Sequence, residues 1–334
     1  MLMIHQGALG DLILSLPTLA TLRKTFPQAK SVIMGYPGIL QLVEERFYAE
    51  KIVSVDQKGM ASFFVPGGPL DRDLSILMNT FDLIVVFGKD EKGVLIENLK
   101  RICPGRILHI RSFPRPGERI HVVDHLLKEI SRYGFSISDA VPKIYLNESD
   151  RTWGSDFWRR KGLTAEERSR LIVIHPGSGS RKKVWPLERF VDLIHYLETH
   201  LRSKTVIVLG PAEGREIQDG LEGMGEGAPL LVKGLSLLQV ASVIERCRLF
   251  IGNDSGISHL AAALGLPTVT IFGPTDPIVW SPRGEKVVVI QKKIDCSPCP
   301  QGRFFLCRDF ECVREIGVEE VLKGLKRMGI RFQS

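Results

Sequence analysis

The sequence predicts an α/β protein made of two doubly wound parallel-sheet domains. Three observations carry this prediction. Short apolar runs alternate with helical patterns in both halves, polar turns follow several of these runs, and a charged interval at 147–170 has no strand pattern. Alternating strands and helices indicate βαβ units and a parallel sheet. Since 334 residues suit two domains better than one, we expect an N-terminal domain at 1–160 and a C-terminal domain at 161–334. The last helix is a candidate for packing back on the N-terminal domain.

The N-terminal half opens with a predicted strand at 2–5 and a glycine-containing turn. Apolar residues between Leu12 and Leu22 then recur near a 3.6-residue period, which predicts a helix. Asp11 stands at the start of this helix. It suits an N-cap, worth about 1 kcal/mol, or a carboxylate held at a cleft edge as a general base, and the two roles are compatible. Further strands are predicted at 31–34, 52–55, 83–87 and 107–110.

The pattern restarts with a strand at 171–174, followed by the turn His175-Pro-Gly-Ser-Gly-Ser-Arg-Lys-Lys-Val-Trp-Pro186. Its glycines and serines allow close backbone approach to a ligand. Lys182 and Lys183 either offset the charge of a bound diphosphate or form solvated surface. A P-loop is excluded, because the sequence has no G-x-x-x-x-G-K-[ST]. A helix at 187–200 and strands at 205–209, 230–232, 249–251 and 267–272 complete the predicted set.

The turn after strand 249–251, Asn253-Asp-Ser-Gly-Ile-Ser-His259, opens a helix at the carboxyl end of the sheet. Open α/β sheets bind ligands at that edge, and free N–H groups at a helix N-terminus suit phosphate. Asp254 would repel phosphate, so we expect it to accept hydrogen bonds from ligand hydroxyls. Ser255 and His259 lie four apart on one helix face. The alternative is that Asp254 or Ser255 only caps the helix while His259 is half-buried filler. With the rest of the chain, the turn favours a nucleotide or sugar nucleotide.

The amino-acid composition limits the classes of binding partner that we expect. A net charge of +7 and a pI near 9.1 point to an anionic partner. We rank nucleic acid low, because no binding-module signature occurs and aromatics are 7% of the chain. The N-terminus lacks a secretory signal pattern, and the uncharged stretch at 255–275 divides into helix and strand, which predicts buried core. We expect a cytoplasmic protein that makes peripheral contact with the inner membrane surface.

Two patterns could hold metal, and we expect neither to do so. Four cysteines cluster late in the chain, at Cys296, Cys299, Cys307 and Cys312. Their spacing matches no zinc module, so reduced thiols are the default and a structural metal is the alternative. Asp71-Arg72-Asp73 spells D-x-D but follows no predicted strand, and we treat it as accidental. We expect no metal and no cofactor.

Together these motifs resemble the ADP-heptose:lipopolysaccharide heptosyltransferases, glycosyltransferase family 9. The resemblance rests on Gly10-Asp11 with Pro17, His175-Pro-Gly with Lys183-Val-Trp-Pro186, Asn253-Asp-Ser-Gly256 with His259-Leu-Ala-Ala, and Phe272-Gly-Pro-Thr-Asp-Pro277. The cysteine-rich tail resembles the heptosyltransferase II branch. The resemblance implies a GT-B fold, two Rossmann-like domains facing a central cleft. It also implies inverting, metal-independent transfer of heptose from ADP-L-glycero-β-D-manno-heptose to the inner core of lipopolysaccharide.

The resemblance also implies roles for individual residues. The general base falls on Asp11, and the lysine near the donor phosphates falls on Lys183. The remaining donor-binding residues are Ser178, Glu213 for the ribose with Glu216 as its neighbouring competitor, Asp254, Ser255, Gly256 and His259. The acceptor is phosphorylated, so the basic stretch Arg106, Arg111, Arg115 and Arg119 with His121 is a candidate docking face, with Arg111, Arg119 and His121 as its acceptor ligands. The alternative for each arginine is a solvated loop.

Other functions stay open at this point. A GT-B transferase for another nucleotide sugar or another glycan would share these motifs. Sugar-nucleotide 2-epimerases also have two Rossmann-like domains, although the Gly10-Asp11 and Lys-x-Trp-Pro motifs argue against them. A non-catalytic nucleotide-sugar binding protein is the alternative outside enzymes, and the presence of Asp11 weighs against it.

Overall fold

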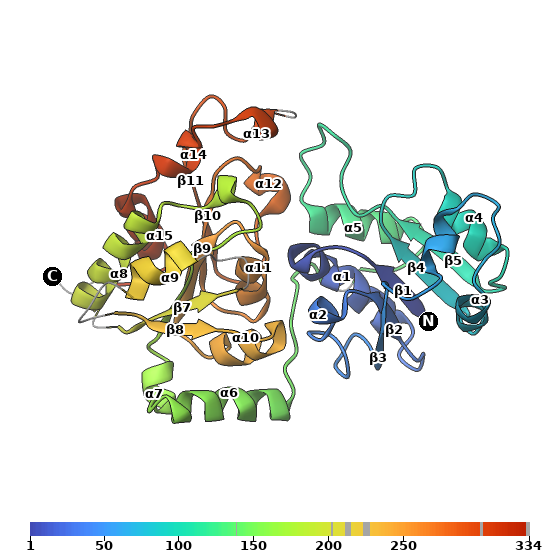
Figure 1. Cartoon of the computed structure of the whole chain (residues 1–334), viewed down its shortest axis with the longest axis horizontal. Coiled ribbons are helices and arrows are strands. Elements are labelled where there is room, and N and C mark those ends of the chain that lie inside the picture. The colour runs from blue at the N-terminus through green and yellow to red at the C-terminus, as the bar shows by residue number, and fades with distance from the viewer. Residues whose placement is uncertain (138, 202, 211–214, 223–227, 301–302, 332–334) are drawn as a thin grey trace. The chain divides into compact units, whose positions relative to one another are not determined.

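The computed structural model of the protein describes residues 1–137, 139–201, 203–210, 215–222, 228–300 and 303–331. The chain divides into two compact units, Met1–Tyr145 (unit 1) and Leu146–Ser334 (unit 2). Each unit contains one sheet whose strands are all parallel (Figure 1). The prediction of an α/β protein with two parallel sheets is therefore confirmed.

Unit 1 has a five-stranded sheet in the order β3-β2-β1-β4-β5. Its strands are β1 (Leu2–His5), β2 (Val32–Gly35), β3 (Lys51–Ser54), β4 (Leu83–Phe87) and β5 (Arg106–Ile110). Its helices are α1 (Leu9–Thr25), α2 (Pro37–Leu40), η1 (Met60–Phe64, a 3₁₀ helix), α3 (Arg72–Asn79), α4 (Val94–Lys100) and α5 (Val122–Ser131).

Unit 2 has a six-stranded sheet in the order β11-β10-β9-β6-β7-β8. Its strands are β6 (Ile172–His175), β7 (Thr205–Leu209), β8 (Leu230–Lys233), β9 (Leu249–Asn253), β10 (Thr268–Phe272) and β11 (Val287–Gln291). Its helices are α6 (Glu148–Arg160), α7 (Ala165–Arg168), η2 (Arg181–Lys183), α8 (Leu187–Leu201), α9 (Arg215–Glu222), α10 (Leu237–Ile244), α11 (Gly256–Ala263), α12 (Pro277–Trp280), α13 (Arg303–Leu306), α14 (Glu311–Arg314) and α15 (Val318–Arg327).

The central strands explain why the apolar runs predicted the sheets so well. Every residue of β1, β4, β6, β7, β9 and β10 is buried. Strands covered by helices on both faces are apolar almost throughout, so they stand out as continuous runs. In each sheet the strand order reverses beside the first strand, between β1 and β4 in unit 1 and between β6 and β9 in unit 2. Ligands of doubly wound folds bind at the carboxyl ends of the strands at such switch points.

The charged interval at 147–170 folds as α6 and α7. Asn147 caps α6 through its side chain, and the indole Nε1 of Trp158 donates to the Val243 carbonyl of α10 at 2.9 Å. Figure 1 shows α6 beside α10, so this helix is part of unit 2. The last helix, α15, was a candidate for packing on the N-terminal domain. It buries Val321 and Leu325 in the core of unit 2, against β11 and α8.

Two further expectations concern the C-terminal half. Strand β11 is missing from the predicted set. It pairs with β10 from Thr268↔Val287 to Phe272↔Gln291 and closes that edge of the sheet. The uncharged stretch at 255–275 forms α11 and β10 and is largely buried, as predicted. Within the described part of the chain, no helix combines the length and apolarity needed to cross a membrane.

Candidate functional site

The carboxyl ends of β6 and β9 are bonded to each other at the switch point of unit 2. Asn253, the fully buried last residue of β9, donates through Nδ2 to the Pro176 carbonyl at 2.7 Å and accepts the Trp185 N–H through Oδ1 at 3.1 Å. The hydroxyl of Ser178 donates to the Asp254 carbonyl at 2.7 Å. These hydrogen bonds therefore hold the turns after the two strands together.

The two charged residues predicted to face the donor contact each other. Lys183 Nζ lies 2.9 Å from Asp254 Oδ2, and the hydroxyl of Thr275 donates to the same oxygen. The Asp254 side chain is 7% exposed and that of Lys183 is 24% exposed. A carboxylate this deeply buried needs a cation and hydrogen bonds, and the lysine that provides the charge still reaches solvent. A separate ligand contact was predicted for each residue, and Thr275 was not predicted to belong to the site although its motif is part of the family resemblance.

The N-terminus of α11 completes this edge. Ser255 is the N-cap, and its hydroxyl accepts the Ser258 N–H at 3.4 Å. Gly256 is the first residue of the helix, so the backbone N–H groups here belong to the turn that an α-helix leaves without internal partners. His259 is 5% exposed, so it is buried rather than half-buried. Ser255 thus caps the helix and also lies beside the Lys183–Asp254 pair.

The neighbouring lysine points elsewhere. Lys182 Nζ donates to the Phe304 carbonyl at 2.6 Å and lies over the rings of Phe304 and Phe310, 5.3 and 5.6 Å from their centroids. Trp185 anchors the same segment, because its fully buried indole donates to the Ile316 carbonyl at 2.8 Å. The two adjacent lysines of η2 therefore make different contacts, and Lys183 is the one at the switch point.

Asp11 lies at the corresponding switch point of unit 1. It is the third residue of α1, and its Oδ2 accepts the Ala8 N–H at 2.9 Å, which caps the helix and fixes the carboxylate. Gly7 is required beside it, because a Cβ at position 7 would lie 2.6 Å from Asp11 Cβ and 2.8 Å from Cε1 of His5. Asp11 lines a cavity of about 320 Å³ formed at the carboxyl ends of β1 and β4. The N-cap is therefore Ala8 and not Asp11, and the bond that Asp11 makes back to the Ala8 N–H holds its carboxylate against the cavity.

His5, which the sequence analysis did not single out, supports this turn. It ends β1, is 4% exposed and accepts the Gly7 N–H through Nδ1 at 3.3 Å. Burial lowers the pKa of His5 to about 4, while a hydrogen bond with the Asp11 backbone acts in the opposite direction. The imidazole is therefore neutral at pH 7. A lone histidine at a strand end carries no motif, so the sequence offered no signal for this role.

The depressed pKa of His5 predicts a pH dependence of stability. The unfolded chain takes up a proton near the ordinary value of 6.5, whereas the folded protein does so near 4. The contribution is therefore fully present above pH 6.5 and is lost as pH falls to 4. With one pKa unit worth about 1.4 kcal/mol, the loss in free energy of unfolding is on the order of 3 kcal/mol. Urea unfolding across this range should show His5→Asn losing less stability than the wild type. Equal losses would assign the pH dependence to other groups.

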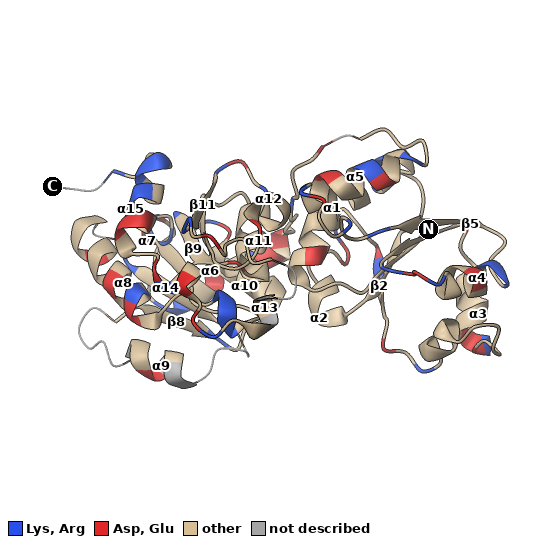
Figure 2. Ribbon diagram, turned by 90° about the horizontal axis from the view of Figure 1, so that it is seen from above, with Lys and Arg blue, Asp and Glu red and all other residues tan. Residues whose placement is uncertain are grey.

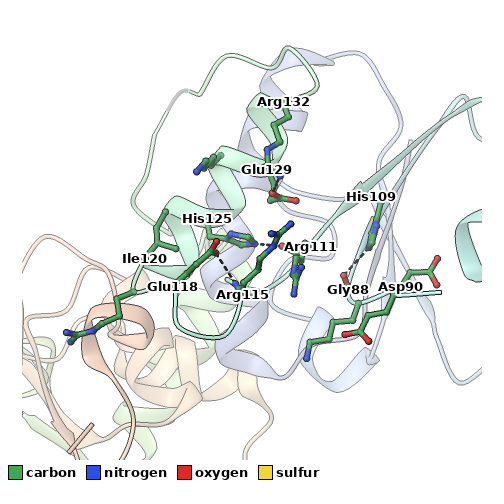
Figure 3. Close-up of a pocket in the computed structure, with 14 residues that line it drawn as sticks. Gly88, Asp90, His109, Arg111, Arg115, Glu118, Ile120, His125, Glu129 and Arg132 are labelled. Carbon is green, nitrogen blue, oxygen red and sulfur yellow. Dashed lines mark hydrogen bonds and ion pairs between the residues drawn. The ribbon is translucent and has the colours of Figure 1, made fainter. Parts of the chain in front are cut away.

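A larger cavity of about 760 Å³ lies next to the Asp11 cavity and shares residues 88–90 with it. Figure 3 shows that its lining is strongly charged. Six basic side chains line it, against four acidic ones: Lys89, Arg111, Arg115, Arg119, Lys128 and Arg132, with Asp90, Glu91, Glu118 and Glu129. Figure 2 shows that α5 in unit 1 and α8 in unit 2 each carry both basic and acidic residues. This cavity therefore gathers a local excess of positive charge that suits an anionic ligand.

Only some of the residues predicted to bind the acceptor line this cavity. Arg111 and Arg119 line it, but His121 is the N-cap of α5, where its Nδ1 accepts the Val123 N–H at 3.2 Å, and it is absent from the lining. Arg106 is the first residue of β5 and donates to the Tyr133 carbonyl at 3.3 Å. It therefore lies at the amino end of this strand, whereas Arg111 follows its carboxyl end. His125, which the sequence analysis missed, lines the cavity and holds the Arg111 carbonyl through Nε2 at 2.8 Å (Figure 3).

The structure describes both of the patterns that were considered as metal sites. Asp71 caps α3 by accepting the Leu74 N–H at 3.0 Å. Burial and the nearby Cys296, Cys307 and Cys299 raise the pKa of Cys312 to about 11. Over the described ranges, no group of three or more His, Cys, Asp or Glu side chains is arranged to hold a metal ion. Glu213 lies outside the described residues, as does the side chain of Glu216.

Comparisons with known proteins give a family match and a shared fold. Residues 123–303 match the sequence model of glycosyltransferase family 9 (heptosyltransferase). Lipopolysaccharide heptosyltransferase 3 of Escherichia coli strain K12 is 24% identical over 299 residues, which are 84% of each chain. Two solved structures share the fold. A glycosyl transferase family 9 protein from Veillonella parvula has a TM-score of 0.78 at 23% identity, covering 98% of this chain and 96% of its own. ADP-heptose lps heptosyltransferase II of E. coli has a TM-score of 0.75 at 19% identity, covering 98% and 97%.

Proposed function

This chain belongs to glycosyltransferase family 9, the heptosyltransferase family, and from that premise we propose that it transfers heptose from ADP-L-glycero-β-D-manno-heptose to the inner core of lipopolysaccharide. The family match over residues 123–303 is the observation that carries the proposal. The acceptor is anchored in a membrane, so the proposal includes peripheral contact of the enzyme with the cytoplasmic face of the inner membrane.

We assign the donor to unit 2. The switch point there combines the Lys183 ammonium, the hydroxyl of Ser178 and the N–H groups at Ser255 and Gly256. An ammonium and a helix N-terminus are the groups that bind a diphosphate. Asp254 holds Lys183 in place, and its oxygens can also accept hydrogen bonds from the donor sugar. His259 and Glu213 remain donor-binding residues in this proposal.

We assign the acceptor to unit 1. The basic cavity that contains Arg111 and Arg119 suits the phosphates of the lipopolysaccharide core, and the adjoining cavity presents Asp11. Because residues 88–90 line both, one acceptor molecule can place an anionic group in the first cavity and a hydroxyl in the second. His121 then acts on the acceptor only indirectly, by capping the helix that carries His125 and Lys128.

The proposed reaction is a single inverting displacement. Asp11 removes the proton from the acceptor hydroxyl, and the oxygen forms its bond to the anomeric carbon as the bond from that carbon to the ADP oxygen breaks. The sugar develops oxocarbenium character, as in glycoside hydrolysis, and the diphosphate gains negative charge. Lys183 and the backbone N–H groups at the start of α11 stabilise that charge.

The direct test is to incubate the protein with ADP-heptose and heptose-deficient lipopolysaccharide, and to measure ADP release together with acceptor mass. Equal yields of ADP and of acceptor heavier by one heptose would support the proposal. Transfer only from a different nucleotide sugar would leave a GT-B transferase of other specificity. Binding of ADP-heptose without release of ADP would favour a non-catalytic binding protein.

Activity is expected to survive EDTA, because Lys183 and the helix N–H groups supply the positive field that the departing diphosphate needs. Initial rates with and without chelator should agree within about twofold. Loss of activity that Mg²⁺ or Mn²⁺ restores would contradict this and return Asp71 and Asp73 to the candidates. Restoration by Zn²⁺ alone would instead implicate the cysteine cluster.

A further inference from the structure

Phe64 is a large apolar side chain that the fold of unit 1 leaves exposed beside Asp11. It is the last residue of η1 and is 48% exposed, whereas the preceding Phe63 is fully buried in the core. Phe64 also lines the 320 Å³ cavity that contains Asp11, together with the rings of Phe87 and Phe113. An aromatic side chain left half exposed in the same cavity as Asp11 needs a physical reason.

The backbone around Phe64 is held on both sides. Asn98 of α4, which is 2% exposed, donates through Nδ2 to the Phe63 carbonyl at 2.9 Å and to the Val65 carbonyl at 3.0 Å. Arg101 donates to Asn98 Oδ1 at 2.9 Å and so fixes the amide orientation. A buried side chain that satisfies two carbonyls makes this segment a well-defined structure. It buries Phe63 and presents Phe64 to the cavity.

The rest of that cavity wall combines apolar residues with polar and charged ones. Asp11, Gln6, Ser112, Lys89 and Asp90 supply charges and hydrogen-bonding groups. A sugar ring matches such a wall, because its hydroxyls lie around the rim while its C–H groups form apolar faces. The face of an aromatic ring carries partial negative charge and attracts C–H groups, so an aromatic side chain covers a sugar face well.

We propose that Phe64 is the platform on which the acceptor sugar stacks, with the attacking hydroxyl turned toward Asp11. The proposal rests on the proposed function and adds a residue that binds and orients the acceptor sugar. Stacking on Phe64 buries apolar area on both partners and fixes the plane of the ring. Phe64 touches no reacting atom, so its contribution belongs to acceptor binding and orientation.

Val65 provides a matched control. It is 51% exposed and sits on the same loop, but it is absent from the lining of the Asp11 cavity. Truncation of either side chain removes a half-exposed apolar group, so the two variants should keep the thermal stability of the wild type. A general contact of this loop with lipid would depend on both residues, whereas stacking of an acceptor sugar depends on Phe64 alone.

The experiment compares Phe64→Ala, Phe64→Tyr and Val65→Ala by steady-state kinetics, with ADP-heptose and a deacylated, heptose-deficient core oligosaccharide as acceptor. We expect Phe64→Ala to raise the acceptor KM about tenfold or more, with the donor KM unchanged. Phe64→Tyr should restore it, and Val65→Ala should match the wild type. An unchanged acceptor KM in Phe64→Ala, or an equal rise in Val65→Ala, would overturn the proposal. So would a defect seen only with vesicle-bound acceptor, which would assign Phe64 to lipid contact.

A failure of the proposed function can be distinguished from a failure of the stacking proposal. If the wild type transfers no heptose, calorimetric titration of the same deacylated oligosaccharide still compares the wild type with Phe64→Ala. Weaker binding by Phe64→Ala would support stacking without heptosyl transfer, and equal affinities would overturn it. If the wild type transfers heptose and Phe64→Ala behaves identically, only the stacking proposal is lost.

Discussion

Replacing Asp11 by Asn is expected to lower turnover about 10²- to 10⁴-fold and to leave donor affinity nearly unchanged. Asn keeps the size of the side chain, and its carbonyl oxygen can still accept the Ala8 N–H that Asp11 accepts at 2.9 Å. The helix cap therefore survives while the group that takes the acceptor proton is removed. Rates measured by ADP release, with ADP affinity measured by calorimetry, give the two quantities.

The chain contains a matched control for this substitution. Asp150 is the third residue of α6 and accepts the Asn147 N–H at 2.9 Å, the same capping geometry as Asp11. Asp150→Asn should alter stability by about as much as Asp11→Asn and leave turnover intact. Near-normal turnover in Asp11→Asn would show that Asp11 is a cap only, and a comparable loss in Asp150→Asn would show that damaged caps, rather than a lost base, slow the enzyme.

Replacing Lys183 by Ala is expected to lower kcat/KM about 10²- to 10³-fold. Two effects add. The departing diphosphate loses its ammonium, and the 7% exposed Asp254 loses the cation that lies 2.9 Å from it, so a buried carboxylate then faces the phosphates. Lys183→Arg should recover part of the loss, because the charge returns with altered geometry. Steady-state kinetics at varied ADP-heptose concentration measure the effect.

A double-mutant cycle separates these two effects. In Lys183→Ala/Asp254→Asn the buried charge is removed along with the lysine, so ADP should bind more tightly than to Lys183→Ala alone. Lys182→Ala serves as the neighbouring control, because Lys182 donates to the Phe304 carbonyl and lies over the rings of Phe304 and Phe310. Equal losses in Lys182→Ala and Lys183→Ala would mean that only the overall positive charge of this segment matters. Strict additivity in the double mutant would remove Asp254 from the explanation.

Much of the fold was predictable because the determining signals are local. Buried parallel strands are continuous apolar runs, and 83–87 and 205–209 were predicted with the bounds that β4 and β7 have. Strand β11 was not predicted, although Val287-Val-Val-Ile290 is an apolar run of the same kind. The capping bond that Asp11 accepts follows from residue type and position at a helix start. Interactions between residues that are close in the chain can be predicted from the sequence alone.

The sites were predictable only as separate motifs. Arg106 and Arg111 looked equivalent in the sequence, but they stand at opposite ends of β5, and only Arg111 reaches the cavity. Lys182 and Lys183 are adjacent, and the fold sends one to Phe304 and the other to Asp254. No spacing rule distinguishes them, because the partners are more than 70 residues away in the chain.

The sequence by itself determined the α/β class, the two parallel sheets, the family and the polar turns that follow the strands, because each depends on periodicity or on motifs of a few residues. The tertiary structure alone decided which of those turns share an edge. Strand order joins the ends of β6 and β9 in one unit and those of β1 and β4 in the other, and it thereby pairs Lys183 with Asp254 and brings Phe64 to the cavity of Asp11. Such contacts arise from packing of segments remote in sequence, and their strength depends on burial and distance, which exist only once the chain has folded.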